Sequence, residues 1–225
     1  ICISYTPGIK QNRLHIFLFI KKRFFLFMTT DNAQSLNIQP QPETAHVTEQ
    51  LASGDLNDLC DATYAAIADG GGFGWVTPPS RQILERYWNG VITMPARDLF
   101  VARLDRIICG TAQLIHPPEN NEAQRFAVDI TALFIAPWAR NHGLARLLLN
   151  RVETYAKDSG YRVINLDVRE SQAAAIRLYE SAGYNCFGRH PYYAIVDGTT
   201  IAGRYYYKCL DPALCGDTQT SRVDV

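Results

Sequence analysis

The chain has 225 residues, of which 47% are hydrophobic, and its 22 basic residues balance its 22 acidic residues. A formal charge of zero gives no electrostatic reason to expect nucleic acid or an anionic membrane as a partner. The six cysteines show no Cys-x-x-Cys spacing, so we interpret most of them as small core or surface residues of a cytoplasmic protein.

The two ends of the chain differ in composition from its middle. Residues 1–27 carry two short apolar runs, separated by a basic tripeptide, and neither run approaches the roughly 20 apolar residues that span a membrane. We interpret this segment as translated upstream sequence, with an N-terminal anchor as the alternative. The polar residues 28–44 predict a flexible tail before a domain at 45–211, and residues 212–225 are expected to form a loose C-terminal tail.

The first part of the domain predicts a strand, a helix, a loop and a second helix. His46–Leu51 is the expected strand, and the apolar spacing between Leu56 and Ile67 predicts the first helix. The loop that follows is rich in glycine and carries two large aromatic residues, Phe73 and Trp75. It either packs these rings on the core or forms an adaptable wall of a substrate pocket. Ile83–Trp88 indicates the second helix.

A hairpin and a long buried strand come next. Leu99–Leu104 and Ile107–Ile115 read as two strands joined by the short turn Asp105-Arg106. Val128–Ala136 is almost continuously apolar, which suits a strand covered on both faces. From Leu144 the apolar residues recur at three- and four-residue steps, which is typical of an amphipathic helix.

The turn between this strand and this helix, Arg140–Ala145, has the composition of an anion site. The first N–H groups of a helix lack internal partners, and the helix dipole is positive at that end. Gly143 and Ala145 would let an anion approach the backbone, and Arg140 adds charge. An ordinary connection whose glycine only tightens the bend is the alternative.

The last part of the domain predicts a strand, a helix and a hairpin. Arg162–Val168 alternates as a strand does, and the following helix is expected between Ser171 and Gly183. Tyr184–Tyr193 and Thr200–Leu210 predict two final strands around the turn Asp197-Gly198.

This succession of a strand, a phosphate-type turn, a helix, a second strand and a second helix resembles the acetyl-CoA-binding half of the GNAT superfamily of N-acetyltransferases. Arg140–Ala145 resembles its Arg/Gln-x-x-Gly-x-Gly/Ala pyrophosphate loop, although His142 stands where the family usually has Arg or Lys. Asn165–Val168 and Ala175–Tyr184 resemble its next strand and helix. Other segments of the chain, including Gly70–Trp75, resemble the tabtoxin-resistance-type acetyltransferases, which act on a small amine-bearing toxin.

This resemblance implies an α/β (α+β) fold: a mixed, mostly antiparallel central sheet of about six to seven strands with helices on both faces. It also implies an acyltransferase that uses acetyl-CoA and no metal, and that acetylates a primary amine of a small molecule. A protein N-terminal acetyltransferase of the ribosomal-protein type and a non-catalytic acetyl-CoA-binding sensor are the alternatives. The expected partner is therefore a small amine, not nucleic acid or a membrane, and a homodimer is left open.

The resemblance further implies roles for individual residues. Tyr179 matches the general acid that protonates the departing thiolate, while Asp167 and Asp129 are two candidates for the general base. No Ser or Cys nucleophile lies beside a base in this pattern, which favours direct transfer to the amine.

Two further groups of residues are expected to hold the substrates. The expected cofactor-binding residues are Phe134, Ile135, Arg140, Asn141, His142, Gly143, Leu144, Ala145 and Gln172. The expected acceptor-binding residues are Phe73, Trp75 and Tyr192.

Overall fold

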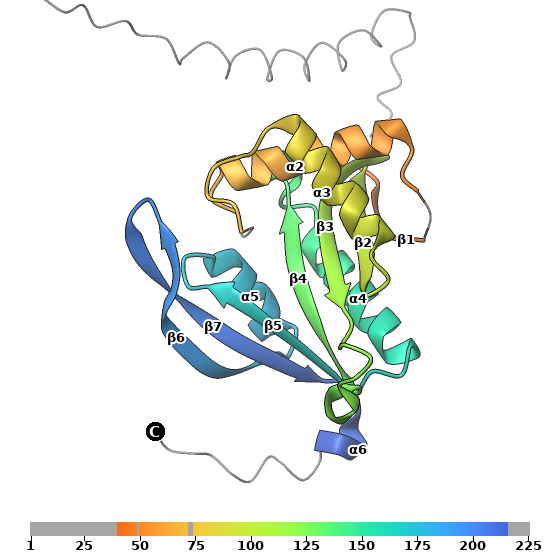
Figure 1. The fold of residues 1–225 in the computed structure, drawn as a ribbon, viewed down its shortest axis with the longest axis vertical. Helices are drawn as coiled ribbons and strands as arrows, with labels where there is room; N and C mark the ends of the chain where they lie inside the picture. The colour runs from red at the N-terminus through yellow and green to blue at the C-terminus, as the bar shows by residue number, and fades with distance from the viewer. Residues whose placement is uncertain (1–39, 49, 72–73, 216–225) are drawn as a thin grey trace, which may run out of the picture. The chain divides into compact units, whose positions relative to one another are not determined.

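A seven-stranded sheet with the strand order β1-β2-β3-β4-β5-β7-β6 forms the centre of the domain (Figure 1). The computed structural model describes residues 40–48, 50–71 and 74–215. The strands are β1 (Pro42–Val47), β2 (Arg97–Leu104), β3 (Ile107–Ile115), β4 (Ala127–Ile135), β5 (Val163–Arg169), β6 (Asn185–Val196) and β7 (Thr199–Cys209). Neighbouring strands are antiparallel except β4 and β5, which are parallel. The predicted mixed, mostly antiparallel sheet is confirmed.

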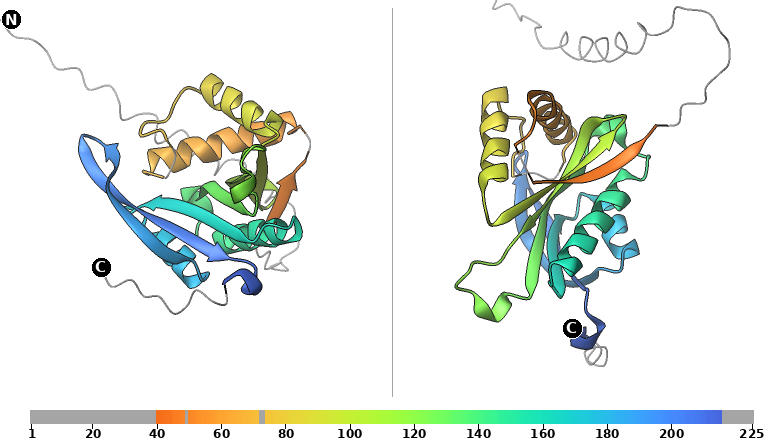
Figure 2. Two further views of the ribbon diagram at one scale, coloured as in Figure 1. Left: turned by 60° about the horizontal axis from the view of Figure 1, so that its bottom comes forward. Right: turned by 90° about the vertical axis from the view of Figure 1, so that its right-hand side faces the viewer.

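Helices cover both faces of this sheet (Figures 1 and 2). Helices α2 (Ser53–Ala68) and α3 (Arg81–Thr93) pack on one face, and α4 (Leu144–Asp158) and α5 (Ala173–Ser181) pack on the other. The short helices are η1 (Glu122–Gln124), η2 (Pro137–Ala139) and α6 (Pro212–Cys215). Across the described part of the chain, we find no helix with the length and hydropathy to cross a membrane.

The strands alternate their side chains between two hydrophobic cores. Along β2, Phe100 and Ala102 enter the core under α4 and α5, whereas Leu99 and Val101 enter the core under α2 and α3. Because successive side chains of a strand point to opposite faces, a central strand must be apolar at nearly every position. This explains why the middle of the sequence shows continuous apolar runs rather than alternation.

Two tight turns occur where the sequence predicts them. Asp105 and Arg106, between β2 and β3, have φ values of 51° and 71°, and Asp197 and Gly198, between β6 and β7, have 50° and 75°. Two consecutive positive φ values match the right-handed twist of the flanking strands in a two-residue hairpin. Both turns are confirmed.

Three local features differ from the expectations. Strand β1 begins at Pro42 rather than His46, because an edge strand accepts proline at its first residue. The N-cap of α5 is Gln172 rather than Ser171, and it makes no side-chain capping bond. Cys209 is disulfide-bonded, whereas Cys60, Cys109 and Cys186 are free thiols.

The expectations for residues 1–27, and for the parts of the two tails at 28–39 and 216–225, lie outside the described residues.

An arginine clamp fixes the β6–β7 hairpin against the end of β5. The carboxylate of Glu170 accepts hydrogen bonds from Nε and Nη2 of Arg189 and from Nε of Arg204, each at 2.9 Å. Bidentate arginine pairs constrain orientation as well as distance. The clamp therefore positions the hairpin beside the C-terminal end of β5.

Candidate active site

The sheet opens between β4 and β5. These strands pair from Ala127 and Val163 to Ile130 and Leu166, and the ladder ends there although both strands continue. They then diverge toward their C-terminal ends (Figure 1). Ligands of α/β sheets commonly bind at such an opening, where strand ends and loops meet.

A β-bulge in β4 bends the strand at the start of this opening. Thr111 of β3 pairs with Phe134, but Gln113 pairs with Thr131, so Ala132 and one further residue of β4 lie opposite a single residue. Ala132 has a φ of 50°, and its carbonyl accepts a hydrogen bond of 3.0 Å from the Thr111 hydroxyl. Bulges increase local twist and re-aim side chains, and they are common beside active sites.

Glycine is required where β3 approaches the end of β4. A Cβ atom at Gly110 would lie 2.4 Å from the carbonyl oxygen of Phe134 and 2.5 Å from Cδ1 of Ile135. Any larger residue would push β4 outward into the opening. The close approach therefore fixes the position of the Phe134–Ile135 backbone.

The turn that follows β4 presents the N-terminus of α4. Asn141 and Gly143 adopt left-handed conformations with φ values of 69° and 72°, and Gly143 is the N-cap of the helix. Among the described residues, no side chain caps α4, and none lies within 4 Å of the position of a Cβ at Gly143. The first N–H groups of the helix therefore face a region that an anion can approach.

A cavity of about 530 Å³ lies at this helix end, and we call it the turn cavity. Its walls come from the β4–α4 turn, the end of β4, the start of α5 and the C-terminal end of α2. Three arginines, Arg140, Arg146 and Arg177, are among its lining residues. Positive charge from three arginines beside a helix N-terminus suits a ligand with several phosphate groups.

Two polar contacts connect the α2 side of the turn cavity to its other walls. Nη1 of Arg140 lies 2.7 Å from a carboxylate oxygen of Asp69, and Nε2 of Gln172 donates to the carbonyl of Gly70 at 2.7 Å. The ion pair is about half exposed on both sides, so it contributes little to stability. It nevertheless places a carboxylate in competition with any anion for Arg140.

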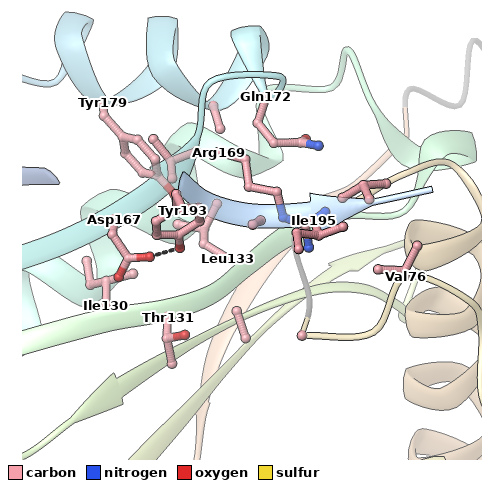
Figure 3. Close-up of a pocket in the computed structure, with 16 residues that line it drawn as sticks. Val76, Ile130, Thr131, Leu133, Asp167, Arg169, Gln172, Tyr179, Tyr193 and Ile195 are labelled. Atoms are coloured by element: carbon pink, nitrogen blue, oxygen red, sulfur yellow. Dashed lines mark hydrogen bonds between the residues drawn. The ribbon is translucent and has the colours of Figure 1, made fainter. Parts of the chain in front are cut away.

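A second cavity of about 460 Å³ lies on the other side of the opening, and we call it the hairpin cavity. Figure 3 shows its lining, which comes from β4, β5, α5, the β6–β7 hairpin and the loop after α2. Its polar side chains include Asp167, Arg169, Tyr179 and Tyr193. The hydroxyl of Tyr193 donates a hydrogen bond to Oδ2 of Asp167.

Tyr179 reaches this cavity from α5 while remaining almost enclosed. Its side chain is 5% exposed and packs near Tyr184 and Tyr206, with ring centroids 5.7 Å and 6.3 Å away. Burial, together with the negative charge of Asp167, raises the pKa of Tyr179 well above its ordinary value. Tyr179 is therefore a protonated phenol at neutral pH.

The two candidate carboxylates are placed differently. Asp167 lines the hairpin cavity and influences the pKa of Tyr179, whereas Asp129 lines neither cavity. Asp129 lies opposite Asn165 in the paired part of β4 and β5. Burial raises the pKa of Asp129, and a hydrogen bond with Asn165 opposes this change. The geometry therefore favours Asp167 as the group near a reacting centre.

Comparison with known proteins gives the family. Residues 61–184, more than half of the chain, match the acetyltransferase (GNAT) family. The chain belongs to this family. It is 58% identical, over 143 residues, to an uncharacterized N-acetyltransferase in the hisH-hisA intergenic region of Azospirillum brasilense, covering 62% of this chain and 85% of that protein.

Two further relatives illustrate the range of this acetyltransferase family. A ribosomal protein bS18-alanine N-acetyltransferase of Escherichia coli K12 is 36% identical over 89 residues, covering 36% of this chain and 60% of that protein. A phosphinothricin acetyltransferase of Sinorhizobium meliloti, solved in complex with AcCoA, has a TM-score of 0.62. It is 19% identical and covers 77% of this chain and 89% of its own, so it supports the fold alone.

Most of the cofactor-binding residues expected in this acetyltransferase line one cavity. The turn cavity is lined by Phe134, Ile135, Arg140, Asn141, Gly143, Leu144, Ala145 and Gln172. His142 is not among its lining residues, and Nδ1 of its ring lies 3.3 Å from the carbonyl oxygen of Ala139. His142 therefore turns back onto η2 rather than into the cavity.

The expected acceptor-binding residues that the structure describes do not line either cavity. Trp75 lines neither cavity, because its ring packs edge-on against Tyr87 at 5.1 Å beside the core under α2 and α3. Its neighbours Gly74 and Val76 line the hairpin cavity instead. Tyr192 is 77% exposed and lines neither cavity, and Phe73 lies outside the described residues.

Several lining residues were not predicted from the sequence of this acetyltransferase. They include Asp69, Arg146, Arg177 and Tyr193. The position of Arg146 in the first turn of α4 was a usable signal, since that turn adjoins the predicted anion site. The others depend on the packing of elements that are distant in the sequence, for which the sequence carries no local signal.

Proposed function

We propose that this acetyltransferase moves the acetyl group of acetyl-CoA directly to the primary amine of a small molecule. The observation that carries this proposal is the junction of the two cavities. Leu133, Gln172 and Ala175 line both of them, and Asp167 and Tyr179 line the hairpin cavity. A cosubstrate in one cavity and an acceptor in the other would therefore meet at these two groups.

In this proposal the turn cavity holds acetyl-CoA. The pyrophosphate would bind the first N–H groups of α4 at Gly143 and the guanidinium of Arg140. The ion pair between Arg140 and Asp69 would have to break for this to happen. Arg146 and Arg177 add positive charge on the same cavity wall. The end of β4 supplies the edge that β5 leaves uncovered, which suits the binding of an amide-containing arm.

The chemistry needs one proton acceptor and one proton donor. Acetyl-CoA supplies an activated carbonyl, and the C–S bond breaks as the amine nitrogen forms the new C–N bond. Asp167 takes the proton that the amine loses, directly or through water. Tyr179 gives its proton to the departing thiolate, and its raised pKa keeps that proton in place until then.

The shape of the hairpin cavity supports a small acceptor. Tyr193, Ala194, Ile195 and Val196 of β6 form part of its wall, so the hairpin covers this side of the opening. A volume of about 460 Å³ falls within the range of pockets that enclose small molecules. An extended peptide would instead need an open groove across the strand ends.

A second candidate is acetylation of a protein N-terminus. The segment that is 36% identical to the Escherichia coli bS18-alanine N-acetyltransferase favours it. The two candidates differ in how much of the acceptor must fit under the β6–β7 hairpin.

An acceptor screen distinguishes the candidates. Release of the CoA thiol is measured with a panel of small primary amines and with peptides that begin with alanine, and the Tyr179→Phe variant serves as the chemistry control. We expect turnover with small amines and a strong loss in the variant. Turnover with peptides alone would replace the small-molecule assignment, and absence of turnover with every amine would refute the proposed function.

A further inference from the structure

The β6–β7 hairpin contains an irregularity beside the hairpin cavity. His190 of β6 pairs with Gly203 of β7, but the next recorded pair is Ala194 with Ile201. Three residues of β6 therefore lie opposite a single residue of β7. Such an insertion interrupts the ladder and locally bends the strand. Within it Tyr192 is exposed to solvent, while Tyr193 lines the cavity.

The ring of Tyr193 lies directly on the backbone of Gly203. A Cβ atom at Gly203 would fall 2.2 Å from Cγ and 2.4 Å from Cδ2 of this ring. Gly203 is not one of the glycines with positive φ, so its backbone conformation would accept other residues. The need for glycine comes from the tyrosine ring, because any side chain at this position would displace it.

With its ring in this position, Tyr193 contacts the proposed base. Its hydroxyl donates to Oδ2 of Asp167, as the dashed line in Figure 3 shows. Burial and this hydrogen bond raise the pKa of Tyr193, so its hydroxyl keeps its proton and remains a donor. Asp167 lies at an exposed position of β5, where an unrestrained carboxylate could rotate.

We propose that Tyr193 is a positioning residue that orients the Asp167 carboxylate, and that Gly203 is the position that permits it. This inference rests on the proposed function, since Asp167 is the base only in that mechanism. With Oδ2 held by Tyr193, Oδ1 has a fixed direction from which it can accept the proton of the amine. A donor bound to a carboxylate also stabilises its ionised form, which is the form that acts as a base.

The first test compares Tyr193→Phe with Tyr192→Phe, using the amine with the highest turnover in the acceptor screen. Loss of a hydrogen bond to a charged group should lower kcat by about 10- to 100-fold in Tyr193→Phe, with the KM for acetyl-CoA unchanged. Its pH–rate profile should differ from that of the wild type, because the hydrogen bond to the Asp167 carboxylate is lost. Tyr192→Phe should behave as the wild type.

A second variant tests the role of Gly203. Gly203→Ala should reproduce the rate and the pH profile of Tyr193→Phe, and the double variant should be no slower than either single variant. The stabilisation of the protein by acetyl-CoA, measured as a shift in the thermal midpoint, confirms that each variant is folded. Additive rate losses, or a Tyr193→Phe enzyme with wild-type rate and pH profile, would overturn the inference.

A readout without turnover separates this inference from the proposed function. In protein labelled with ¹³C at aspartate carboxyl groups, the Asp167 signal is assigned by its absence in Asp167→Asn. Its titration curve should change in Tyr193→Phe and not in Tyr192→Phe. If no amine in the screen is acetylated, the proposed function fails while this result still supports the contact. An unchanged curve in Tyr193→Phe would refute the positioning role even in an active enzyme.

Discussion

Substitution of Gly143 by aspartate should abolish the stabilisation of the protein by acetyl-CoA. An aspartate at this N-cap would place its own carboxylate beside the N–H groups of α4 that are proposed to hold the pyrophosphate. The like charge would repel phosphate. Because no described residue lies within 4 Å of a Cβ at Gly143, the substitution itself should create no steric clash.

The expected magnitudes follow from the structure and from mass action. At a concentration 100 times the Kd, acetyl-CoA should stabilise the wild-type protein by about 2.7 kcal/mol. For a domain of this size, this corresponds to a rise in Tm of about 5–10 °C. The left-handed φ of 72° at Gly143 costs a non-glycine residue about 1 kcal/mol, and aspartate is among the residues that tolerate it best. The variant should therefore remain folded, with a Tm only a few degrees lower.

Gly160→Asp provides a matched control. Gly160 follows the other end of α4, has a φ of 86°, and likewise has nothing within 4 Å of its Cβ position. The control therefore imposes the same backbone cost and the same charge far from the proposed phosphate site. Thermal melting with and without acetyl-CoA should show the full shift in Gly160→Asp and none in Gly143→Asp. Equal shifts in the two variants would refute the assignment of the turn cavity to the cofactor.

Five other changes have definite expected outcomes. Tyr179→Phe should lower kcat by about 10²–10⁴-fold with little change in the KM for acetyl-CoA, and a full rate would mean that another group protonates the thiolate. Asp167→Asn should remove the acidic limb of the pH–rate profile while Asp129→Asn keeps it, and the reverse result would transfer the role of base to Asp129. Hydrogen bonds from two arginines lower the pKa of Glu170 from 4.5 to about 2, so its contribution to stability should be complete above pH 4.5 and lost as the pH falls toward 2. The Tm difference between the wild type and Glu170→Gln should shrink over that interval, and a constant difference would contradict the clamp. Deletion of residues 1–27 should leave Tm and turnover unchanged, whereas membrane association that is lost on deletion would restore the anchor interpretation.

Local signals in the sequence predicted much of the fold. The hairpin turn at Asp197-Gly198 was recognisable because few residue pairs accept two positive φ values in succession. The start of α4 at Leu144 was recognisable because the apolar period changes there from that of a strand to that of a helix. These features depend on a few adjacent residues, so they can be predicted from the local sequence.

The features that the sequence did not predict arise from contacts between distant segments. Ala132 has a positive φ although alanine has no preference for it, so the bulge in β4 is imposed by the β3–β4 register. Tyr193, next to the expected Tyr192, lines the hairpin cavity, and the insertion in β6 beside it is set by the pairing of β6 with β7. The pairing of Arg146 on α4 with Ser181 on α5 likewise depends on how two helices pack.

The early end of the β4–β5 ladder has a mechanical consequence. It divides the sheet into a block of β1 to β4 and a block of β5, β7 and β6, joined by the short parallel ladder that ends at Ile130 and Leu166. A cosubstrate inserted beyond that ladder would act as a wedge that touches both blocks and replaces the missing interstrand contacts. Opening motions of the two blocks would then be coupled through the ligand. Amide hydrogen exchange in β6 and β7 should accordingly slow when acetyl-CoA binds, although the turn cavity is not lined by either strand.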